Sequence, residues 1–120
     1  MPERDLMLVF SNPVDGQDGP YNEWYDQIHL AEVLAVPGVI SAQRYALAPV
    51  EILDTEEHPA PPPPAHRYLA LYELDGEPGE IMAECGRRMV SGEMSMHESL
   101  DPGSLSTAIW RARGPRRTAG

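Results

Sequence analysis

The longest amphipathic pattern in the chain covers residues 21–38 and has the period of an α-helix. Asn22 is a favourable N-cap, and Glu23 and Asp26 follow in the first turn, where the helix dipole stabilises negative charge. A Pro-Gly pair closes the segment and cannot continue a helix, so we expect the helix to stop there. At about 100° per residue, one face of this helix is an apolar stripe formed by Tyr21, Trp24, Ile28, Ala31 and Ala35.

Three polar or amphipathic side chains run beside that stripe. Tyr25, His29 and Glu32 are spaced i, i+4 and i+7, so they stack along one edge of the helix. His29 is the strongest candidate for acid–base chemistry, because an unperturbed imidazole has a pKa of about 6.5. Glu32, one turn further on, is placed to orient or charge the imidazole. The alternative is that the hydrogen bond of His29 serves packing alone.

The rest of the chain alternates between strand-like and helix-like segments. We predict strands over residues 6–11, 38–47, 66–74 and 105–112. A second amphipathic helix is predicted over residues 80–90, with Cys85 among its inward, apolar side chains. The order β-α-β-β-α-β contains two split βαβ halves, which is typical of a ferredoxin-like α+β sandwich. We therefore expect one α+β domain over residues 1–113.

One face of such a sheet packs against the helices, and the other face needs a cover. We assign five apolar side chains to this second face, namely Met7, Val9, Ile40, Leu69 and Leu71. Together they form a patch too apolar to leave in water. We therefore expect a homodimer in which the two sheets pack face to face.

Residues 48–65 interrupt the pattern, because they are acidic at first and then rich in proline. Such a segment has no core to contribute and favours extended polyproline geometry. We expect a long, mobile hairpin connection, and the alternative is a docking element for a proline-binding partner. Residues 114–120 are expected to be a disordered basic tail.

Charge and cysteine content exclude several classes of function. The 120-residue chain has 9 basic and 19 acidic residues, a net charge of −10, and every basic residue is Arg. A chain with this much negative charge repels the phosphate backbone of DNA and RNA. We therefore expect no nucleic-acid partner. The lack of Lys excludes Schiff-base catalysis by a side-chain amine. Cys85 is the single cysteine, which excludes an internal disulfide and Cys-rich zinc sites.

The sequence gives no sign of membrane insertion or export. Residues 1–12 lack the charged start and apolar core of a signal peptide, and no apolar run approaches the length that spans a bilayer. We therefore expect a cytoplasmic protein with no membrane partner.

Short motifs spread over most of the chain suggest a family. They are Ser-Asn-Pro at 11–13, Trp-Tyr-Asp at 24–26, His29, Val-Pro-Gly-Val at 36–39, Arg-Tyr at 44–45, Ser-Gly-Glu-Met at 91–94, Ser-Leu-Asp at 99–101 and the strand with Trp110. Together these motifs resemble the ethyl tert-butyl ether degradation (EthD)-like branch of the dimeric α+β barrel superfamily. The resemblance leaves out residues 48–65. Relatives include polyketide cyclases, dehydratases, cofactor-free oxygenases, haem-handling proteins and members with no assigned activity.

The resemblance implies a ligand cavity within each protomer, between sheet and helices, with His29 facing it. We therefore expect a cofactor-independent acid–base enzyme of the cyclase, dehydratase or isomerase type, acting on a hydrophobic, oxygen-bearing metabolite such as a polyketide or aromatic compound. His29 is the expected base, and Tyr25 and Asn12 are the expected hydrogen-bond donors to the developing oxyanion. The expected substrate-binding residues are Trp24, Glu32, Tyr45, Tyr68, Tyr72 and His97.

Other readings of the same residues stay open. Tyr25 can be a core aromatic residue, and Asn12 can serve only to shape the turn before Pro13. The whole protein can be a non-catalytic small-molecule-binding or accessory protein, or a haem-handling protein with His29 or His97 as the axial ligand.

We expect no metal and no other cofactor. A metal site needs three or four converging ligands, and His29 and Glu32 supply only half of one unless His66 and His97 join them. The sequence contains no phosphate-binding glycine loop, no nucleotide fingerprint and no G-x-S-x-G turn.

Overall fold

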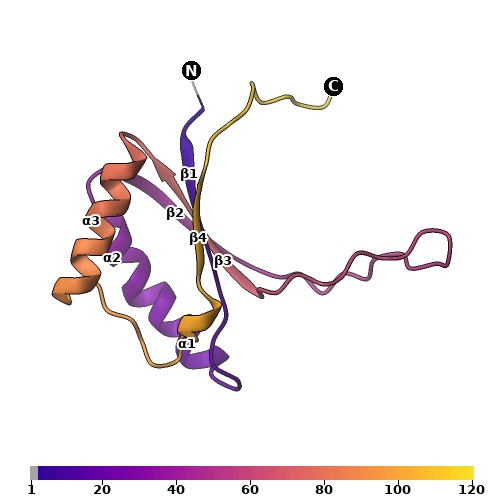
Figure 1. The fold of residues 1–120 in the computed structure, drawn as a ribbon, viewed down its shortest axis with the longest axis horizontal. Coiled ribbons are helices and arrows are strands. Elements are labelled where there is room, and N and C mark those ends of the chain that lie inside the picture. The colour runs from indigo at the N-terminus through magenta and orange to yellow at the C-terminus, as the bar shows by residue number, and fades with distance from the viewer. Residues whose placement is uncertain (1–2) are drawn as a thin grey trace.

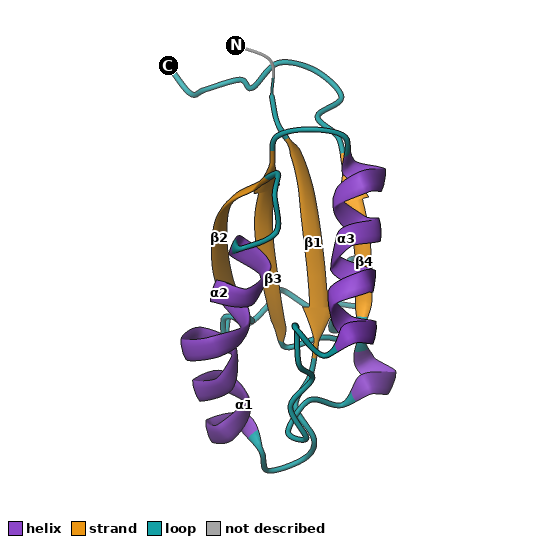
Figure 2. Ribbon diagram, turned by 90° about the vertical axis from the view of Figure 1, so that its left-hand side faces the viewer, coloured by secondary structure: helices purple, strands orange, loops and turns teal. Residues whose placement is uncertain are grey.

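Four antiparallel strands form one sheet, and the helices cover one of its two faces (Figures 1 and 2). The computed structural model describes residues 3–120. The strands are β1 (Asp5–Ser11), β2 (Val39–Ala46), β3 (Tyr68–Leu74) and β4 (Ser106–Trp110). Their spatial order is β2-β3-β1-β4, and β1 pairs with both β3 and β4. This arrangement confirms the predicted ferredoxin-like α+β fold.

The first helix is one continuous segment of three parts. They are α1 (Asp18–Trp24), a π-helical turn η1 (Tyr25–His29) and α2 (Leu30–Leu34). The prediction of Asn22 as the N-cap is wrong, because the helix already begins at Asp18, which itself supplies the acidic side chain of the first turn. Asn22 instead lies inside the helix and donates a hydrogen bond from its side chain to the Tyr68 hydroxyl, at 3.3 Å.

The second helix, α3 (Pro78–Ser91), has well-formed ends. The Glu77 carboxylate accepts a hydrogen bond from the backbone N–H of Glu80 at 3.0 Å, and Pro78 occupies the first turn. Gly92 ends the helix with φ of 86°, a left-handed conformation that favours glycine. A short 3-10 turn, η2 (Pro102–Ser104), then leads into β4.

The two faces of the sheet differ in burial. Register pairs Met7 with Tyr72 and Val9 with Ala70, and these four side chains lie under the helices. The prediction that Met7 and Val9 belong to the second face is therefore wrong. The residues between them in sequence point the other way. We call this second surface the open face, and it carries Leu6, Leu8, Phe10, Leu69, Leu71 and Trp110.

Residues 47–66 form an extended arm that leaves the sheet on the side opposite the helices (Figure 1). The backbone N–H of Leu47 donates to the carbonyl of Arg67 at 2.7 Å, and this is the last pairing at the root of the arm. Among the described residues, the hydrogen bonds made by 49–64 are all to other arm residues. The mobility expected for this segment stays a prediction.

Residues 3–120 contain no helix that is both long and apolar enough to cross a membrane.

Candidate functional site

The π-helical turn decides which residues of the first helix face the sheet. A π turn holds one residue more than an α turn, so it delays every later inward position by one. The buried residues are Tyr21, Trp24 and Tyr25 up to the start of the turn, then His29, Val33 and Val36. Ile28, by contrast, is 51% exposed. The turn therefore places His29 in the interior where a regular helix would place Ile28.

The predicted apolar stripe is correct up to Trp24 and wrong after it. Ile28, Ala31 and Ala35 are all exposed. The reason is the extra residue of the π turn, which a helical wheel of constant period does not contain.

Two single-residue deletions test this explanation. Deleting Gln27 removes the extra residue of the π turn and leaves a regular α-helix with His29, Val33 and Val36 facing inward. We expect this variant to fold with His29 still buried. Deleting Ala31 also leaves a regular α-helix with both valines inward, but it turns Ile28 inward and His29 outward. NMR titration of the histidines should then find a lowered His29 pKa in the first variant and a value of about 6.5 in the second. If His29 has the same pKa in both variants, the π turn does not decide whether His29 faces the interior.

His29 is held in one tautomer by Glu32. The imidazole Nδ1 lies 3.2 Å from Oε1 of Glu32. A carboxylate only accepts hydrogen bonds, so Nδ1 carries the proton and the lone pair of Nε2 is free. The other oxygen of Glu32 accepts a hydrogen bond from the backbone N–H of Ser95 at 3.3 Å, which ties this pair to the loop after α3. Glu32 therefore orients the base and does not line the pocket described below.

His29 is only 8% exposed, and its surroundings favour the neutral imidazole. Burial lowers the pKa of His29, the hydrogen bond and charge of Glu32 oppose this, and the positive charge of Arg44 lowers the pKa further. The net direction is below the ordinary value of about 6.5. At neutral pH the side chain is thus a neutral base.

Aromatic rings surround the imidazole. His29 stacks on Trp24 with a centroid distance of 4.6 Å and contacts the Tyr25 ring edge-on at 4.9 Å. His97 also stacks on Trp24, at 5.8 Å. Its Nδ1 accepts a hydrogen bond from the backbone N–H of Ser99 at 3.1 Å, so its ring is fixed as a support for the indole. His97 does not line the pocket.

A pocket of about 250 Å³ lies between the sheet and the helices, next to this cluster. Its walls come from β1, the first helix, β3, α3, the loop after α3 and β4, and most of the side chains are apolar. Five of the six methionines line it: Met7, Met82, Met89, Met94 and Met96. Thioether side chains are flexible and polarisable, so they adapt to the shape of an apolar ligand. Trp24, Tyr25, His29 and Tyr72 are the expected site residues that the structure brings to this pocket.

The phenols of the pocket stay protonated at neutral pH. Burial raises the pKa of Tyr25 to about 12 and drives that of Tyr72 far above its usual value. Within residues 3–120, the Tyr72 hydroxyl and the indole N–H of Trp24 are buried without a hydrogen-bond partner. Unpaired buried donors are rare because each costs free energy. Both residues line the pocket, but these two donor atoms are themselves shielded from the pocket space.

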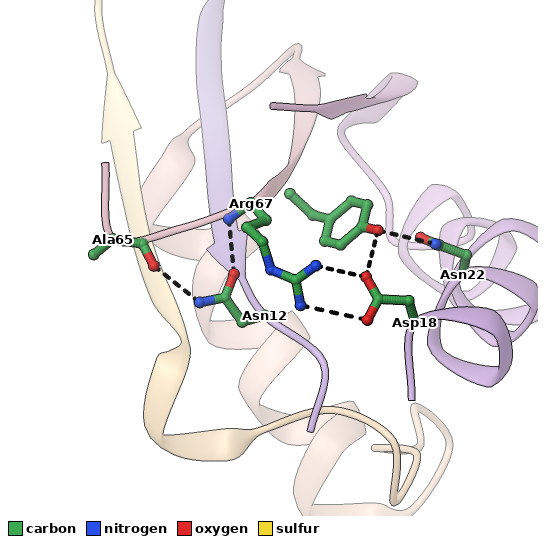
Figure 3. Close-up of polar contacts among 6 residues, drawn as sticks. Asn12, Asp18, Asn22, Ala65 and Arg67 are labelled. Atoms are coloured by element: carbon green, nitrogen blue, oxygen red, sulfur yellow. Dashed lines mark hydrogen bonds and ion pairs between the residues drawn. The ribbon is translucent and has the colours of Figure 1, made fainter. Parts of the chain in front are cut away.

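Three expected site residues lie elsewhere. The Asn12 amide donates to the carbonyl of Ala65 at 2.9 Å and its oxygen accepts from the backbone N–H of Arg67 at 2.7 Å, so Asn12 holds the root of the arm (Figure 3). The Tyr68 hydroxyl donates to Asp18 at 2.8 Å, in the same polar cluster. Tyr45 is 44% exposed on the side of the open face, because it pairs with Leu69. None of the three lines the pocket.

Arg44 is a residue of this region that sequence reasoning missed. Its guanidinium carbon lies 4.4 Å from the centroid of the Tyr25 ring, and Nη1 pairs with Asp26 at 2.9 Å. Alternation along the strand puts Arg44 on one face with Ile40, Ala42 and Ala46. A lone cation on an apolar face was the available signal, since a buried charge needs a partner.

The histidines that a metal site would have required lie in different parts of the structure. Nε2 of His66 contacts the carbonyl oxygen of Ser104 at 2.7 Å, near the arm root. In the part of the chain that the structure describes, no three His, Cys, Asp or Glu side chains are grouped as metal ligands.

Comparison with known proteins identifies the fold. No protein-family model and no curated protein matches the sequence. Among solved structures, an ethyl tert-butyl ether (EthD) family protein from Bacillus halodurans C-125 superposes with a TM-score of 0.52, over 90% of this chain and 96% of that chain. The chain has the EthD fold. The sequences are 16% identical, so the likeness to the EthD protein concerns architecture alone. The fold implied by the sequence motifs is thereby confirmed.

Proposed function

We propose that the pocket binds a hydrophobic, oxygen-bearing small molecule and that His29 moves a proton on it. One observation carries this proposal, namely an imidazole at the wall of an apolar pocket of about 250 Å³ whose Nδ1 contacts Glu32, which leaves Nε2 for a ligand. Apolar walls with a few polar groups are typical of ligand sites. The reaction types that fit are cyclisation, dehydration and isomerisation of a polyketide-like or aromatic compound, without a cofactor.

In this mechanism Nε2 of His29 removes a proton from a carbon next to a carbonyl group of the ligand. The imidazolium that forms keeps its Nδ1–H on the Glu32 carboxylate, which stabilises the new positive charge at 3.2 Å. Negative charge develops on the ligand oxygen and needs donors in a water-poor site. Tyr25 lines the pocket and can supply one. Return of the proton to another atom completes an isomerisation.

The second candidate is binding without turnover. The methionine-rich wall supports it, because such surfaces accommodate apolar ligands of varied shape. In that case the neutral imidazole serves as a hydrogen-bond acceptor for the ligand.

Hydrogen–deuterium exchange separates the two candidates without knowledge of the natural substrate. Aromatic and polyketide-like ketones are incubated with the protein in D2O, and exchange beside the carbonyl is followed by NMR. Proton removal by His29 predicts catalysed exchange for ketones that bind. Binding with no catalysed exchange supports the non-catalytic reading, and no binding by any apolar ketone contradicts both.

We also propose that a second copy of the chain covers the open face. Apolar side chains on all three of the strands β1, β3 and β4 support this, because helices cover only the other side of the sheet (Figure 2). The EthD fold gives the same expectation of a dimer.

A further inference from the structure

The arm carries large apolar side chains that its own protomer leaves in water. Val50, Ile52 and Leu53 are 71%, 63% and 75% exposed. Prolines at 49, 59 and 61–64 restrict the backbone of the segment, so ordering it against a partner costs less chain entropy than ordering a segment without prolines. A proline-rich segment with a row of exposed apolar side chains has the properties of a docking element.

We propose that the arm docks on the C-terminal end of a second copy of this chain, in the dimer that covers the open face. This inference rests on the dimer proposed above. Figure 1 shows that the arm projects from the same side of the sheet as the open face. A copy that covers the open face therefore comes alongside the arm. Two-fold symmetry makes the contact reciprocal, so each protomer gives one arm and receives one.

We take the two-fold axis of the proposed dimer to cross the strands, and the strand register then says which parts of the two copies meet. The arm leaves the sheet where Ser11 pairs with Tyr68, and the C-terminal segment leaves at the opposite end, where Leu6 pairs with Trp110. Such an axis reverses the strand direction of the partner relative to the first copy. Each arm therefore reaches the C-terminal end of the other protomer. That end offers an apolar surface, because Trp110 is 56% exposed.

Charge complementarity supports this partner over an unrelated protein. The arm has four carboxylates and no Arg, whereas residues 111–120 have four Arg and no acid. Arg111 and Arg116 pair with Asp5 and Glu3 of their own chain. Within residues 3–120, Arg113 and Arg117 form no ion pair, so they are free to meet the acidic side chains of a partner's arm.

Leu53→Asp tests the apolar half of the contact, and Val90→Asp is its matched control. Val90 is 92% exposed on α3, on the helix side of the sheet. We expect Leu53→Asp to raise the dimer Kd by about tenfold or more, as for a central interface residue, and Val90→Asp to leave it unchanged. A second variant replaces residues 51–64 by a short Gly-Asn turn and should weaken the dimer at least as much. Sedimentation over a concentration series measures all four proteins, and circular dichroism verifies that they are folded.

The double variant Glu56→Gln/Glu57→Gln tests the charged half of the arm contact, because it shows whether the dimer becomes weaker or stronger. The protomers each carry a net charge of −10, so removing negative charge should strengthen a dimer whose arm faces an acidic surface. If the arm meets the Arg-rich segment, the same change weakens the dimer.

Three outcomes overturn the inference. A wild-type dimer that the arm replacement does not weaken refutes arm docking and leaves the open-face dimer intact. A stronger dimer with the Gln pair refutes the C-terminal segment as the docking site. A wild-type monomer at all concentrations removes the dimer and the arm contact together, and leaves the His29 proposal untouched.

Discussion

Replacing His29 by Gln should lower the rate of catalysed proton exchange on a bound ketone by about 10²–10⁴-fold, the usual effect of losing a general base. Gln keeps a polar side chain of similar reach at this position but has no basic nitrogen at neutral pH. Binding of the ketone should persist, because most of the pocket wall is apolar and does not change. Exchange rates for the variant and the wild type, followed by NMR under the same conditions, provide the measurement.

His58→Gln is the control for loss of an imidazole, because His58 lies in the exposed arm. The His58→Gln variant should catalyse proton exchange on the ketone at the wild-type rate. If the His29→Gln variant also catalyses this exchange as fast as the wild type, His29 is not the base and the mechanism is wrong. If it fails to fold, His29 has a structural role.

The pH dependence of exchange should follow the neutral form of His29. Because burial lowers the pKa of His29, the neutral base is lost only when the pH falls below the ordinary imidazole value of about 6.5. The rate should therefore rise with pH through that acidic range and be level around pH 7. A rate that is still rising above about pH 7 indicates a different base.

Replacing Leu71 by Asp should convert the dimer into a folded monomer. Leu71 lies on the open face, opposite Leu8 on β1, and a carboxylate there would be buried without a partner. An unpaired charge in an interface costs several kcal/mol, so we expect the dimer Kd to rise by about 100-fold or more. Light scattering at micromolar concentration should report about twice the 13.3 kDa chain mass for the wild type and one chain mass for the variant.

Leu34→Asp is the matched control, since Leu34 is 42% exposed on α2, away from the open face. It should dimerise as the wild type does. A monomeric wild type removes the argument for a covered face, and a Leu71→Asp variant that stays dimeric means that the copies meet through another surface.

The order of elements follows from hydrophobic periodicity, but the inward faces of β1, β2 and the first helix do not. The run at 6–11 is apolar at nearly every position, so alternation cannot say which side chains point to the helices. That is why Met7 and Val9 were expected on the wrong face. Pairing with β3 decides the matter, and pairing partners cannot be deduced from one strand.

Single-residue irregularities explain most of the other differences. The π turn shifts the first helix by one residue and replaces Ile28 by His29 in the interior. A register shift between Val39 and Ser41 places Val39 on the helix side and turns Tyr45 to the open side of β2. Neither irregularity has a reliable signature in residue types, because each depends on how the element packs against the rest of the fold.

The placement of His29 beside Glu32 was predictable, since both stand on one edge of any helical segment. The pocket was not, because five methionines from different elements form much of its wall. They approach each other only once α3 and the loop after it pack over the sheet.

NMR titration of His29 tests the central claim most directly, because it needs no substrate. The His29 signals are assigned by comparison with the His29→Gln variant, and the ring nitrogen shifts report both pKa and tautomer. Our account predicts a pKa below about 6.5 and a neutral ring with the proton on Nδ1, facing Glu32. A pKa raised well above neutral pH, which would keep the ring protonated, or a proton on Nε2 means that no free base faces the pocket and contradicts the proposed function.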